Sequence, residues 1–273
     1  MSLPKHNRNV MSERRQAGAA IIVTGAAGGI GGGIVKRFLA DGWRVVATDL
    51  NIKPLAEMQP QADASQLVTR SMDVAKPDDV RKVAASLKED QIAVAGLINA
   101  AGLLQDIGSF MAMDEAAQRR IWDVNYFGAV TCTQVFAASM ISEGGGSIVN
   151  ITSINELRPL PLHAYAPTKV ALGSLTTLTA GEFGPANVRV NSIAPGFTLT
   201  PIMREKIETG KRNVSAIENA TAMRRLVEID EIAAVASFLM SDDASAITGA
   251  SIPVDAGWLA TSYWMNFGEL LRS

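Results

Sequence analysis

The sequence predicts a single-domain α/β fold, a seven-stranded parallel sheet with helices on both faces. Two observations predict it. Short apolar runs alternate with longer segments of helical periodicity from Ala19 to Gly257, as in parallel sheets built from strand–helix–strand units. Glycines and polar residues follow the ends of these runs, and ligands of parallel sheets bind at the carboxyl ends of the strands. Since crossover connections are right-handed, we expect a doubly wound Rossmann fold.

The first expected strand, residues 19–24, is a short apolar run rich in β-branched residues. Such a run suits a strand that is buried on both faces. In all, the expected strands comprise residues 19–24, 44–49, 67–71, 94–99, 147–151, 188–194 and 250–254.

Helical segments separate these strands. In the first, Ile34, Val35 and Phe38 recur at helical spacing. Pro77 suits the first turn of the next helix, because proline needs no backbone donor there. The further expected helices span residues 77–87, 113–141, 164–183 and 230–240.

The composition fits one large domain of ordinary charge. Of 273 residues, 48% are apolar, which is ample for a sizeable core. The net charge of -2 and the pI near 5.8 argue against a nucleic-acid or membrane-surface binder. Apolar stretches are interrupted before they reach the ~18–20 residues of a membrane span, so none is expected. No repeat or linker divides the chain.

The cysteine count and the N-terminus bear on the compartment. Cys132, the only cysteine, lies in a helical, mostly apolar stretch and fits a core residue better than a reactive thiol. A single cysteine forms no internal disulfide, which suits a reducing compartment. Residues 1–18 carry basic residues without an apolar run, unlike a secretory signal. We expect a disordered tail over residues 1–18 and a cytoplasmic protein.

A glycine turn follows the first expected strand. The segment Thr24-Gly25-x-x-x-Gly29-Ile30-Gly31 joins that strand directly to a helix. Glycines let the backbone turn tightly and approach a pyrophosphate, and the helix N-terminus offers N–H groups to the anion. A flexible loop is the alternative, but the position between a strand and an amphipathic helix favours a dinucleotide site.

An acidic residue ends the second strand. Asp49 follows Gly25 by 24 residues, near the roughly 20 expected for the acid that binds the adenosine ribose hydroxyls. A carboxylate there repels the 2′-phosphate of NADP, and Leu50 follows it rather than the arginine that this phosphate favours. We therefore predict NAD over NADP. The alternative is an aspartate that only caps the following loop.

A second motif is Tyr165-Ala166-Pro167-Thr168-Lys169, at the start of a helical segment. Helical spacing puts the tyrosine and the lysine on one face, one turn apart. A phenol titrates near pH ~10, and a neighbouring ammonium lowers that pKa toward the working range of a general base. Alone, the pattern also fits a helix start with an ordinary surface lysine.

Together these residues resemble the classical short-chain dehydrogenase/reductase family over nearly all of the expected domain. The resemblance implies an oxidoreductase that interconverts a small-molecule secondary alcohol and a ketone with a nicotinamide cofactor. It also implies a homotetramer, or a homodimer. The matching motifs are Thr24-Gly-x-x-x-Gly-Ile-Gly31, Asp73, Asn99-Ala-Ala-Gly102, Asn125, Ser153, Tyr165-x-x-x-Lys169 and Pro195-Gly196-x-x-x-Thr200.

The resemblance implies four catalytic residues. Ser153 should hydrogen-bond the substrate oxygen, and Tyr165 should take or give the hydroxyl proton. Lys169 should bind the nicotinamide ribose and lower the pKa of Tyr165. Asn125 should hold a water that relays the proton toward solvent. The alternatives are a helix N-cap for Ser153 and, for Asn125, hydrogen bonds that only satisfy backbone groups in its own helix.

The resemblance also implies the residues of the cofactor site. Asp73 should contact the adenine beside the Val74 backbone, Asn99 should line the groove, and Gly196 to Thr200 should meet the nicotinamide carboxamide. The full expected set is Gly25, Gly28, Gly29, Ile30, Gly31, Asp49, Asp73, Val74, Asn99, Ala100, Ala101, Gly102, Tyr165, Lys169, Pro195, Gly196, Thr198 and Thr200.

The loop after Ser153 departs from the family pattern. The interval to the tyrosine is 12 residues, one shorter than in many members, which makes Thr152 a rival to Ser153. Glu156 stands where a glycine is common. The roles of Glu156, Arg158 and His163 stay open.

Residues 199–226 resemble the mobile substrate lid of this family and carry several basic residues. Those bases could attract an anionic substrate or form a solvated face. The C-terminal aromatics suggest subunit-interface or pocket-closing material, and no Cys/His cluster suggests a metal site. These aromatics are Trp258, Tyr263, Trp264 and Phe267.

Two classes of function remain. One is an NAD-dependent dehydrogenase/reductase acting on a polyol, sugar or hydroxy acid. The other is a non-catalytic nucleotide-sensing protein on the same fold. The set of Ser153, Tyr165 and Lys169 favours the enzyme, because a sensor does not need it. A third hypothesis keeps the enzyme with NADP as cofactor. The sequence leaves the substrate, stereochemistry and physiological direction undetermined.

Overall fold

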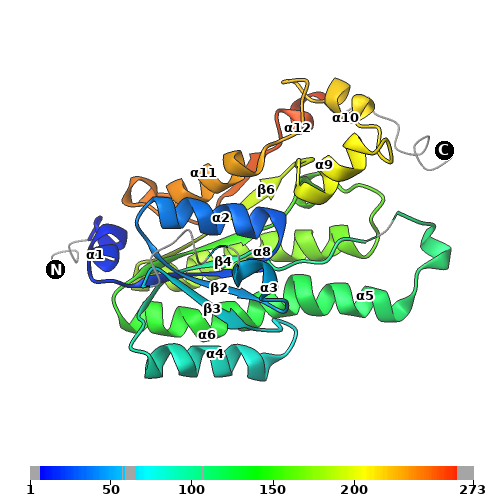
Figure 1. Ribbon diagram of the computed structural model, residues 1–273. Helices are drawn as coiled ribbons and strands as arrows, with labels where there is room; N and C mark the ends of the chain where they lie inside the picture. The colour runs from blue at the N-terminus through cyan, green and yellow to red at the C-terminus, as the bar shows by residue number, and fades with distance from the viewer. Residues whose placement is uncertain (1–6, 57, 59–64, 106, 263–273) are drawn as a thin grey trace.

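The computed structural model describes residues 7–56, 58, 65–105 and 107–262. Within this part of the chain, seven parallel strands form one sheet in the order β3-β2-β1-β4-β5-β6-β7 (Figure 1). The predicted α/β fold is confirmed. The strands are β1 (Ala20–Thr24), β2 (Arg44–Asp49), β3 (Leu67–Ser71), β4 (Val94–Asn99), β5 (Gly146–Ile151), β6 (Val188–Pro195) and β7 (Ser251–Val254).

The strand order reverses at β1. The chain moves outward from β1 to β3, returns to β4 on the other side of β1, and then moves outward to β7. Ile22 accordingly has Val46 of β2 on one side and Leu97 of β4 on the other. Connections that lead away in opposite directions leave a crevice at the carboxyl ends of β1 and β4, where ligands bind in such sheets.

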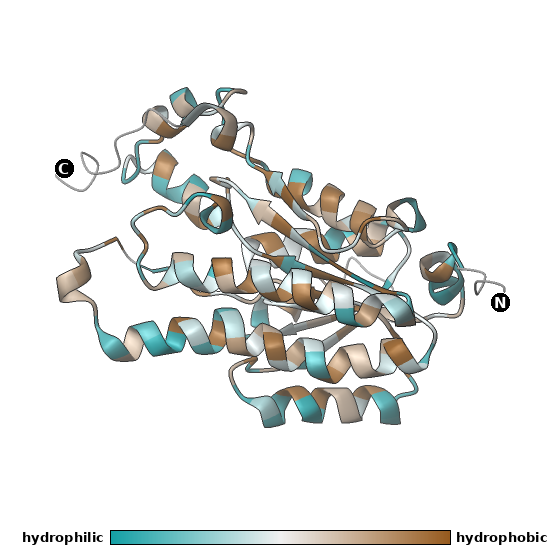
Figure 2. Cartoon of the chain, turned by 180° about the vertical axis from the view of Figure 1, so that it is seen from behind, coloured by the Kyte–Doolittle hydropathy of each residue, from teal (hydrophilic) through white to brown (hydrophobic). Residues whose placement is uncertain are grey.

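Helices cover both faces of the sheet (Figure 1). Helices α2 (Gly29–Ala40) and α11 (Ile229–Leu239) pack against each other on one face, and α4 (Pro77–Glu89), α6 (Ala129–Ser142) and α8 (Tyr165–Phe183) cover the other. Helix α4 alternates polar and apolar residues along its length, as a helix with one buried face does (Figure 2).

The remaining described helical elements are short. They are α1 (Val10–Gln16), α3 (Lys53–Ala56), η2 (Phe110–Ala112), α5 (Glu115–Trp122), η3 (Asp123–Gly128), α7 (Ile154–Leu157), η4 (Gly184–Ala186), α9 (Pro201–Glu208), α10 (Ser215–Ala220), η5 (Asp242–Ala244) and α12 (Trp258–Thr261).

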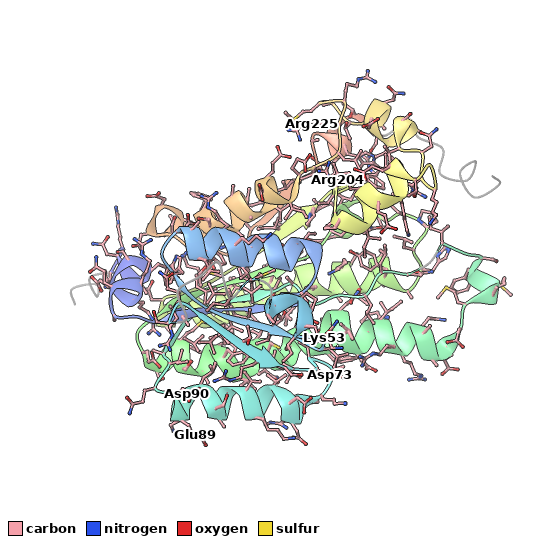
Figure 3. All side chains as sticks on the ribbon, viewed as in Figure 1. Lys53, Asp73, Glu89, Asp90, Arg204 and Arg225 are labelled. Atoms are coloured by element: carbon pink, nitrogen blue, oxygen red, sulfur yellow. The ribbon has the colours of Figure 1, made fainter. Side chains whose placement is uncertain are left out.

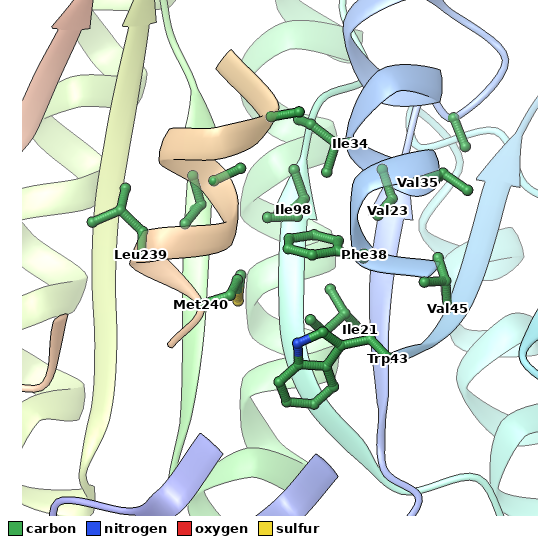
Figure 4. Close-up of a cluster of buried hydrophobic side chains, with 14 of the residues drawn as sticks. Ile21, Val23, Ile34, Val35, Phe38, Trp43, Val45, Ile98, Leu239 and Met240 are labelled. Carbon is green, nitrogen blue, oxygen red and sulfur yellow. The ribbon is translucent and has the colours of Figure 1, made fainter. Parts of the chain in front are cut away.

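A hydrophobic core lies on each side of the sheet. On the side of α2 and α11, Phe38 packs among Ile21, Ile98 and Met240, with Trp43 at one end (Figure 4). The other side is filled from β4, α4, α6 and α8. Burying each large apolar side chain contributes about 1.5–3 kcal/mol, so these two layers dominate the stability of the sheet. All residues of β1 are buried, as its unbroken apolar run predicts.

The expected disordered tail is wrong for Val10–Gln16, which forms α1. Met11 is buried in the core, and Asp242 accepts hydrogen bonds from the backbone N–H groups of Met11 and Ser12 (2.8 and 2.9 Å). Arg14 donates to the Val94 carbonyl at 2.7 Å. These partners lie far away in the sequence, so local composition could not reveal them.

The predicted helix 113–141 corresponds to one continuous helical stretch, Glu115–Ser142, with a π-helical turn inside it. It begins at Glu115, where Asp114 caps it by accepting from Ala117 N (2.7 Å), and it contains the π-helical turn η3 before α6. By length and composition alone, the continuous stretch Glu115–Ser142 could cross a membrane. Half of its most apolar part is buried in this fold, and a core helix passes the same test, so the stretch is weak evidence for a membrane span.

Candidate active site

The carboxyl ends of the strands border a cavity of about 1070 Å³. Almost every expected site residue lines it, which brings together positions from residue 25 to residue 200. The expected residues on the wall are Gly25, Gly28, Gly29, Ile30, Gly31, Asp49, Asp73, Val74, Ala100, Ala101, Gly102, Ser153, Tyr165, Lys169, Pro195, Gly196, Thr198 and Thr200. Asn99 and Asn125 are not among its lining residues.

The glycine turn is held close to the end of β4. Gly25 has φ +65°, and a Cβ there would lie 2.7 Å from Ala101 Cα. Thr24 Oγ1 accepts hydrogen bonds from the N–H groups of Ala100 and Ala101 (3.1 Å each). Gly28 precedes α2 and has no side chain to cap it. The first turn of α2 lines the cavity, and its uncapped N–H groups suit a pyrophosphate.

Asp49 is anchored at the end of β2. Its Oδ2 accepts from Ala27 N (3.1 Å) and its Oδ1 from Asn51 N (2.9 Å). Capping of the following loop, the alternative considered for this residue, thus does occur. The carboxylate still lines the cavity, with exposed Leu50 beside it. Both functions are compatible, because each carboxylate oxygen accepts more than one hydrogen bond.

Asp73 lies just beyond the end of β3 (Figure 3) and is 7% exposed. Its Oδ1 accepts from Ala75 N (3.0 Å), and its Oδ2 lies 3.6 Å from an Arg120 nitrogen. Arg120 comes from α5 and also lines the cavity. The sequence analysis missed it, because only the tertiary fold brings α5 to β3.

The two asparagines bond to the protein itself. Asn99 Nδ2 donates to Thr133 Oγ1 (3.2 Å) and Asn150 Oδ1 (2.8 Å), so this side chain turns into the core rather than the groove. Asn125, in η3, pairs with the backbone of Leu103 through both amide atoms (2.7 and 3.0 Å). The expected lining role of Asn99 is not seen. Asn125 does bond to the backbone, but at Leu103, 22 residues away, and not within its own helix as the alternative had it.

Tyr165 and Lys169 lie together at the start of α8. Lys169 Nζ is 5.5 Å from the centroid of the tyrosine ring and donates to the Ile151 carbonyl (2.8 Å). Burial raises the pKa of Tyr165 to about 12, and a hydrogen bond with Ser153 partly opposes this. Burial lowers the pKa of Lys169 to about 8, and the charge of Glu156 partly opposes that. In the chain alone, desolvation therefore outweighs the expected lowering of the Tyr165 pKa by Lys169.

Of Thr152 and Ser153, only Ser153 has a hydroxyl group free to meet a substrate beside Tyr165. Thr152 Oγ1 donates to the Ile193 carbonyl (2.9 Å) and is thereby committed to the sheet. Ser153 hydrogen-bonds Tyr165 and is 7% exposed on the cavity wall. Its Oγ also accepts from Asn155 N (3.2 Å), so the N-cap alternative holds as well.

The substrate end of the cavity is largely apolar. Its walls come from residues 103–105 and 107, from 160–162, and from α9 and α10, so the expected lid does border the site. Gln105 Oε1 accepts from Ala164 N (2.7 Å) and Tyr165 N (3.2 Å) and so fixes the start of α8. Sequence motifs could not single out this glutamine, because its partners are 59 and 60 residues away.

The basic residues of the lid divide into two groups. Lys211 and Arg212 line the cavity. Arg204 and Arg225 lie on the raised segment above the sheet in Figure 3 and pair with glutamates, Arg204 with Glu228 (3.4 Å). The solvated face fits Arg204 and Arg225, while Lys211 and Arg212 lie where they would meet a ligand in the cavity.

The residues left open by the sequence lie outside the cavity lining. Arg158 donates to Ser262 Oγ (2.6 Å) and the Leu259 carbonyl (3.0 Å), which ties its loop to α12. The His163 ring packs edge-on against the Phe110 ring, with 5.4 Å between the ring centroids.

Of the expected C-terminal aromatic residues, Trp258 is buried behind the cavity against Phe197. The expected aromatic residues Tyr263, Trp264 and Phe267 lie outside the described residues.

Two remaining expectations concern thiol and metal chemistry. Cys132 is fully buried, and burial raises its pKa to about 12, which suits an inert core residue. Within the described ranges, no three His, Cys, Asp or Glu side chains gather as a metal site would require.

Known proteins are similar to this chain over most of its length. A family model described as enoyl-(acyl carrier protein) reductase matches residues 25–259. An uncharacterized short-chain type dehydrogenase/reductase of Sinorhizobium fredii is 36% identical over 258 residues, covering 92% of this chain and 46% of its own length. The chain therefore spans about half the length of that relative.

Two further relatives match along nearly their whole length. The NAD-dependent glycerol dehydrogenase of Listeria innocua is 32% identical, covering 87% of this chain and 92% of that protein. A solved short-chain type dehydrogenase/reductase from Mycobacterium ulcerans superposes with a TM-score of 0.85 at 30% identity, covering 93% and 94% of the two chains. With this fold and this arrangement of residues, the chain belongs to the short-chain dehydrogenase/reductase family of oxidoreductases.

Proposed function

We propose that this protein is an NAD-dependent oxidoreductase that interconverts a secondary alcohol and a ketone by hydride transfer. The observation that carries the proposal is the gathering of Ser153, Tyr165 and Lys169 on the wall of the cavity that also holds the glycine turn and Asp49. A site for a dinucleotide thus adjoins a proton-transfer group and a hydrogen-bond donor. The family supports an oxidoreductase acting on alcohols or ketones.

Asp49 supports NAD as the cofactor. Its carboxylate faces the part of the cavity next to the glycine turn, where it would accept from ribose hydroxyls and repel a 2′-phosphate. Leu50 beside it offers no positive charge. The Listeria relative is named as NAD-dependent, which agrees with this choice. NADP is the alternative within the same family.

The chain's own residues divide the chemistry among them. A bound nicotinamide supplies the hydride acceptor or donor. Ser153 donates a hydrogen bond to the substrate oxygen, which becomes more negative as the carbonyl is reduced. Tyr165 transfers the proton of the hydroxyl group. Lys169 stays protonated below about pH 8 and holds positive charge one helical turn from Tyr165. Asn125 holds the backbone at Leu103 beside this group.

Assembly and location complete the proposal. We infer a homotetramer or homodimer in the cytoplasm. Exposed apolar side chains on α8 and η3, Leu178 (69%), Val170 (43%) and Phe127 (53%), support contacts with a further copy. The buried Cys132, the single cysteine of the sequence, is compatible with a reducing compartment.

The test is NADH formation across a panel of secondary alcohols, polyols and hydroxy acids. Tyr165→Phe is run in parallel and should lower kcat by about 10²–10⁴-fold while NAD still binds, because only the proton-transfer group is removed. Substantial activity in a folded Tyr165→Phe variant would overturn the assignment. NAD binding without turnover of any substrate would favour the nucleotide-sensing alternative.

A further inference from the structure

The Ser153 hydroxyl accepts two hydrogen bonds from a single residue. That residue is Asn155, which donates one from the backbone N–H (3.2 Å) and one from side-chain Nδ2 (2.9 Å). A serine hydroxyl has two lone pairs and one proton. Both acceptor positions are thereby filled, so the proton alone remains, for the hydrogen bond with Tyr165 or for a substrate. Ser153 can then act toward the cavity only as a donor.

The orientation of the Asn155 amide is determined by its other contact. Leu160 N lies 3.0 Å from Asn155 Oδ1. A backbone N–H can only donate, so the amide atom facing it must be the oxygen. The opposite atom, facing Ser153, is therefore the NH₂ group. Asn155 is 4% exposed and lies on the cavity wall, so water does not compete freely for these bonds.

We propose that Asn155 is a positioning residue that fixes the Ser153 hydroxyl as a hydrogen-bond donor to the substrate oxygen. The inference rests on the proposed function, since it concerns the same substrate. A donor aimed in advance at the oxygen stabilises the charge that develops there at no cost of reorientation. The same asparagine holds Leu160, so it also joins Ser153 to a wall of the substrate pocket.

Two substitutions separate orientation from simple packing. Asn155→Asp keeps the shape and the bond from Leu160 but places an acceptor opposite Ser153, whose proton then turns away from the substrate. Asn155→Ala removes both side-chain bonds yet leaves the hydroxyl free to rotate. Positioning predicts the larger loss of kcat for Asn155→Asp, about 10²-fold, since one lost oxyanion donor costs about 10²–10³. A packing role predicts the larger loss for Asn155→Ala.

The background Ser153→Ala is the matched control. In it, Asn155→Asp should change kcat by less than about twofold, because residues that act as a unit are non-additive. An equal loss in both backgrounds, or a larger loss for Asn155→Ala than for Asn155→Asp, would overturn the proposal. NAD affinity and thermal melting identify variants that lose the cofactor or the fold.

The contact can also be measured without turnover. The side-chain amide NMR signals of Asn155 should shift in Ser153→Ala, because the hydroxyl acceptor is lost. Unchanged signals would overturn the inference even if the wild-type protein oxidised no alcohol of the panel. Shifted signals together with an inactive wild type would instead count against the proposed function alone.

Discussion

The carboxylate of Glu156 occupies the space that a side chain on Gly173 would need. A Cβ on Gly173 of α8 would overlap Glu156 Oε1, Cδ and Cγ, and Ser251 Oγ holds the other carboxylate oxygen at 3.0 Å. Gly173 lies one turn beyond Lys169 on the same helix. Glu156, which stands where a glycine is common, is therefore accommodated by a glycine opposite it. Its charge partly opposes the lowering of the Lys169 pKa by burial.

Gly173→Ala should destabilise the protein. Alanine normally gains about 1 kcal/mol over glycine within a helix. Here the new methyl group displaces the Glu156 carboxylate from Ser251, and overpacking costs about 1–3 kcal/mol. The net effect is a lower free energy of unfolding, measured by urea denaturation.

Gly181→Ala is the matched control, because it lies in the same helix with nothing within 4 Å of the added Cβ. That variant should be as stable as the wild type or more stable. Glu156→Ala should relieve the overlap and recover the stability of Gly173→Ala. A Gly173→Ala protein as stable as Gly181→Ala would contradict the contact.

Glu156→Gln should give a pH-dependent loss of stability. The amide keeps an acceptor for Ser251 but removes the charge that raises the pKa of Lys169. The attraction exists only while folded Lys169 is protonated, so it is present below about pH 8 and is lost as the pH rises through that value. The deficit should be about 1 kcal/mol at pH 7 and shrink toward zero at about pH 9.5.

Urea denaturation at the two pH values measures this difference. Ser251→Ala provides the comparison, because it removes the hydrogen bond and leaves the charge. Its deficit should be nearly the same at both pH values. An equally constant deficit in Glu156→Gln would mean that the carboxylate does not act on Lys169.

Asp49→Asn should weaken the preference for NAD. The amide still accepts from the backbone at one oxygen but no longer repels a 2′-phosphate, and like-charge contacts at binding sites cost several kcal/mol. The ratio of kcat/KM for NAD to that for NADP should fall by at least about tenfold, or 1.4 kcal/mol. Asp90→Asn is a control at the far end of α4 (Figure 3) and should leave the ratio unchanged. An unaltered ratio in Asp49→Asn would remove the ribose assignment.

Lys211 and Arg212 should favour substrates that carry a negative charge. Both line the cavity, and neither forms an ion pair with another residue of the described part of the chain. Replacing both with alanine should raise KM for a hydroxy acid about 3- to 10-fold, since exposed charge pairs contribute about 0.2–1 kcal/mol each. KM for a neutral polyol should hardly change.

Lys206→Ala serves as the comparison for this pair. Lys206 belongs to the same lid but does not line the cavity. It should alter neither KM. A similar rise of both KM values in the double variant would instead indicate a lid that acts by closure and not by charge.

Local patterns determined much of this protein. The apolar runs specified the strands, because a strand buried on both faces needs no polar residue. The glycines at 25–31 indicated the cavity wall through their place between a strand and a helix, and the pair Tyr165 and Lys169 did so in combination with the other motifs.

Only the tertiary structure decided the rest. Asn99 turns into the core because Thr133 and Asn150 meet it there, and α1 is ordered because Asp242 accepts its N–H groups. The pKa of Tyr165 rises because burial around it outweighs its hydrogen bond with Ser153. Burial and hydrogen-bond partners depend on residues distant in the chain, so neighbouring sequence specifies the elements while their packing specifies the environment of each functional group.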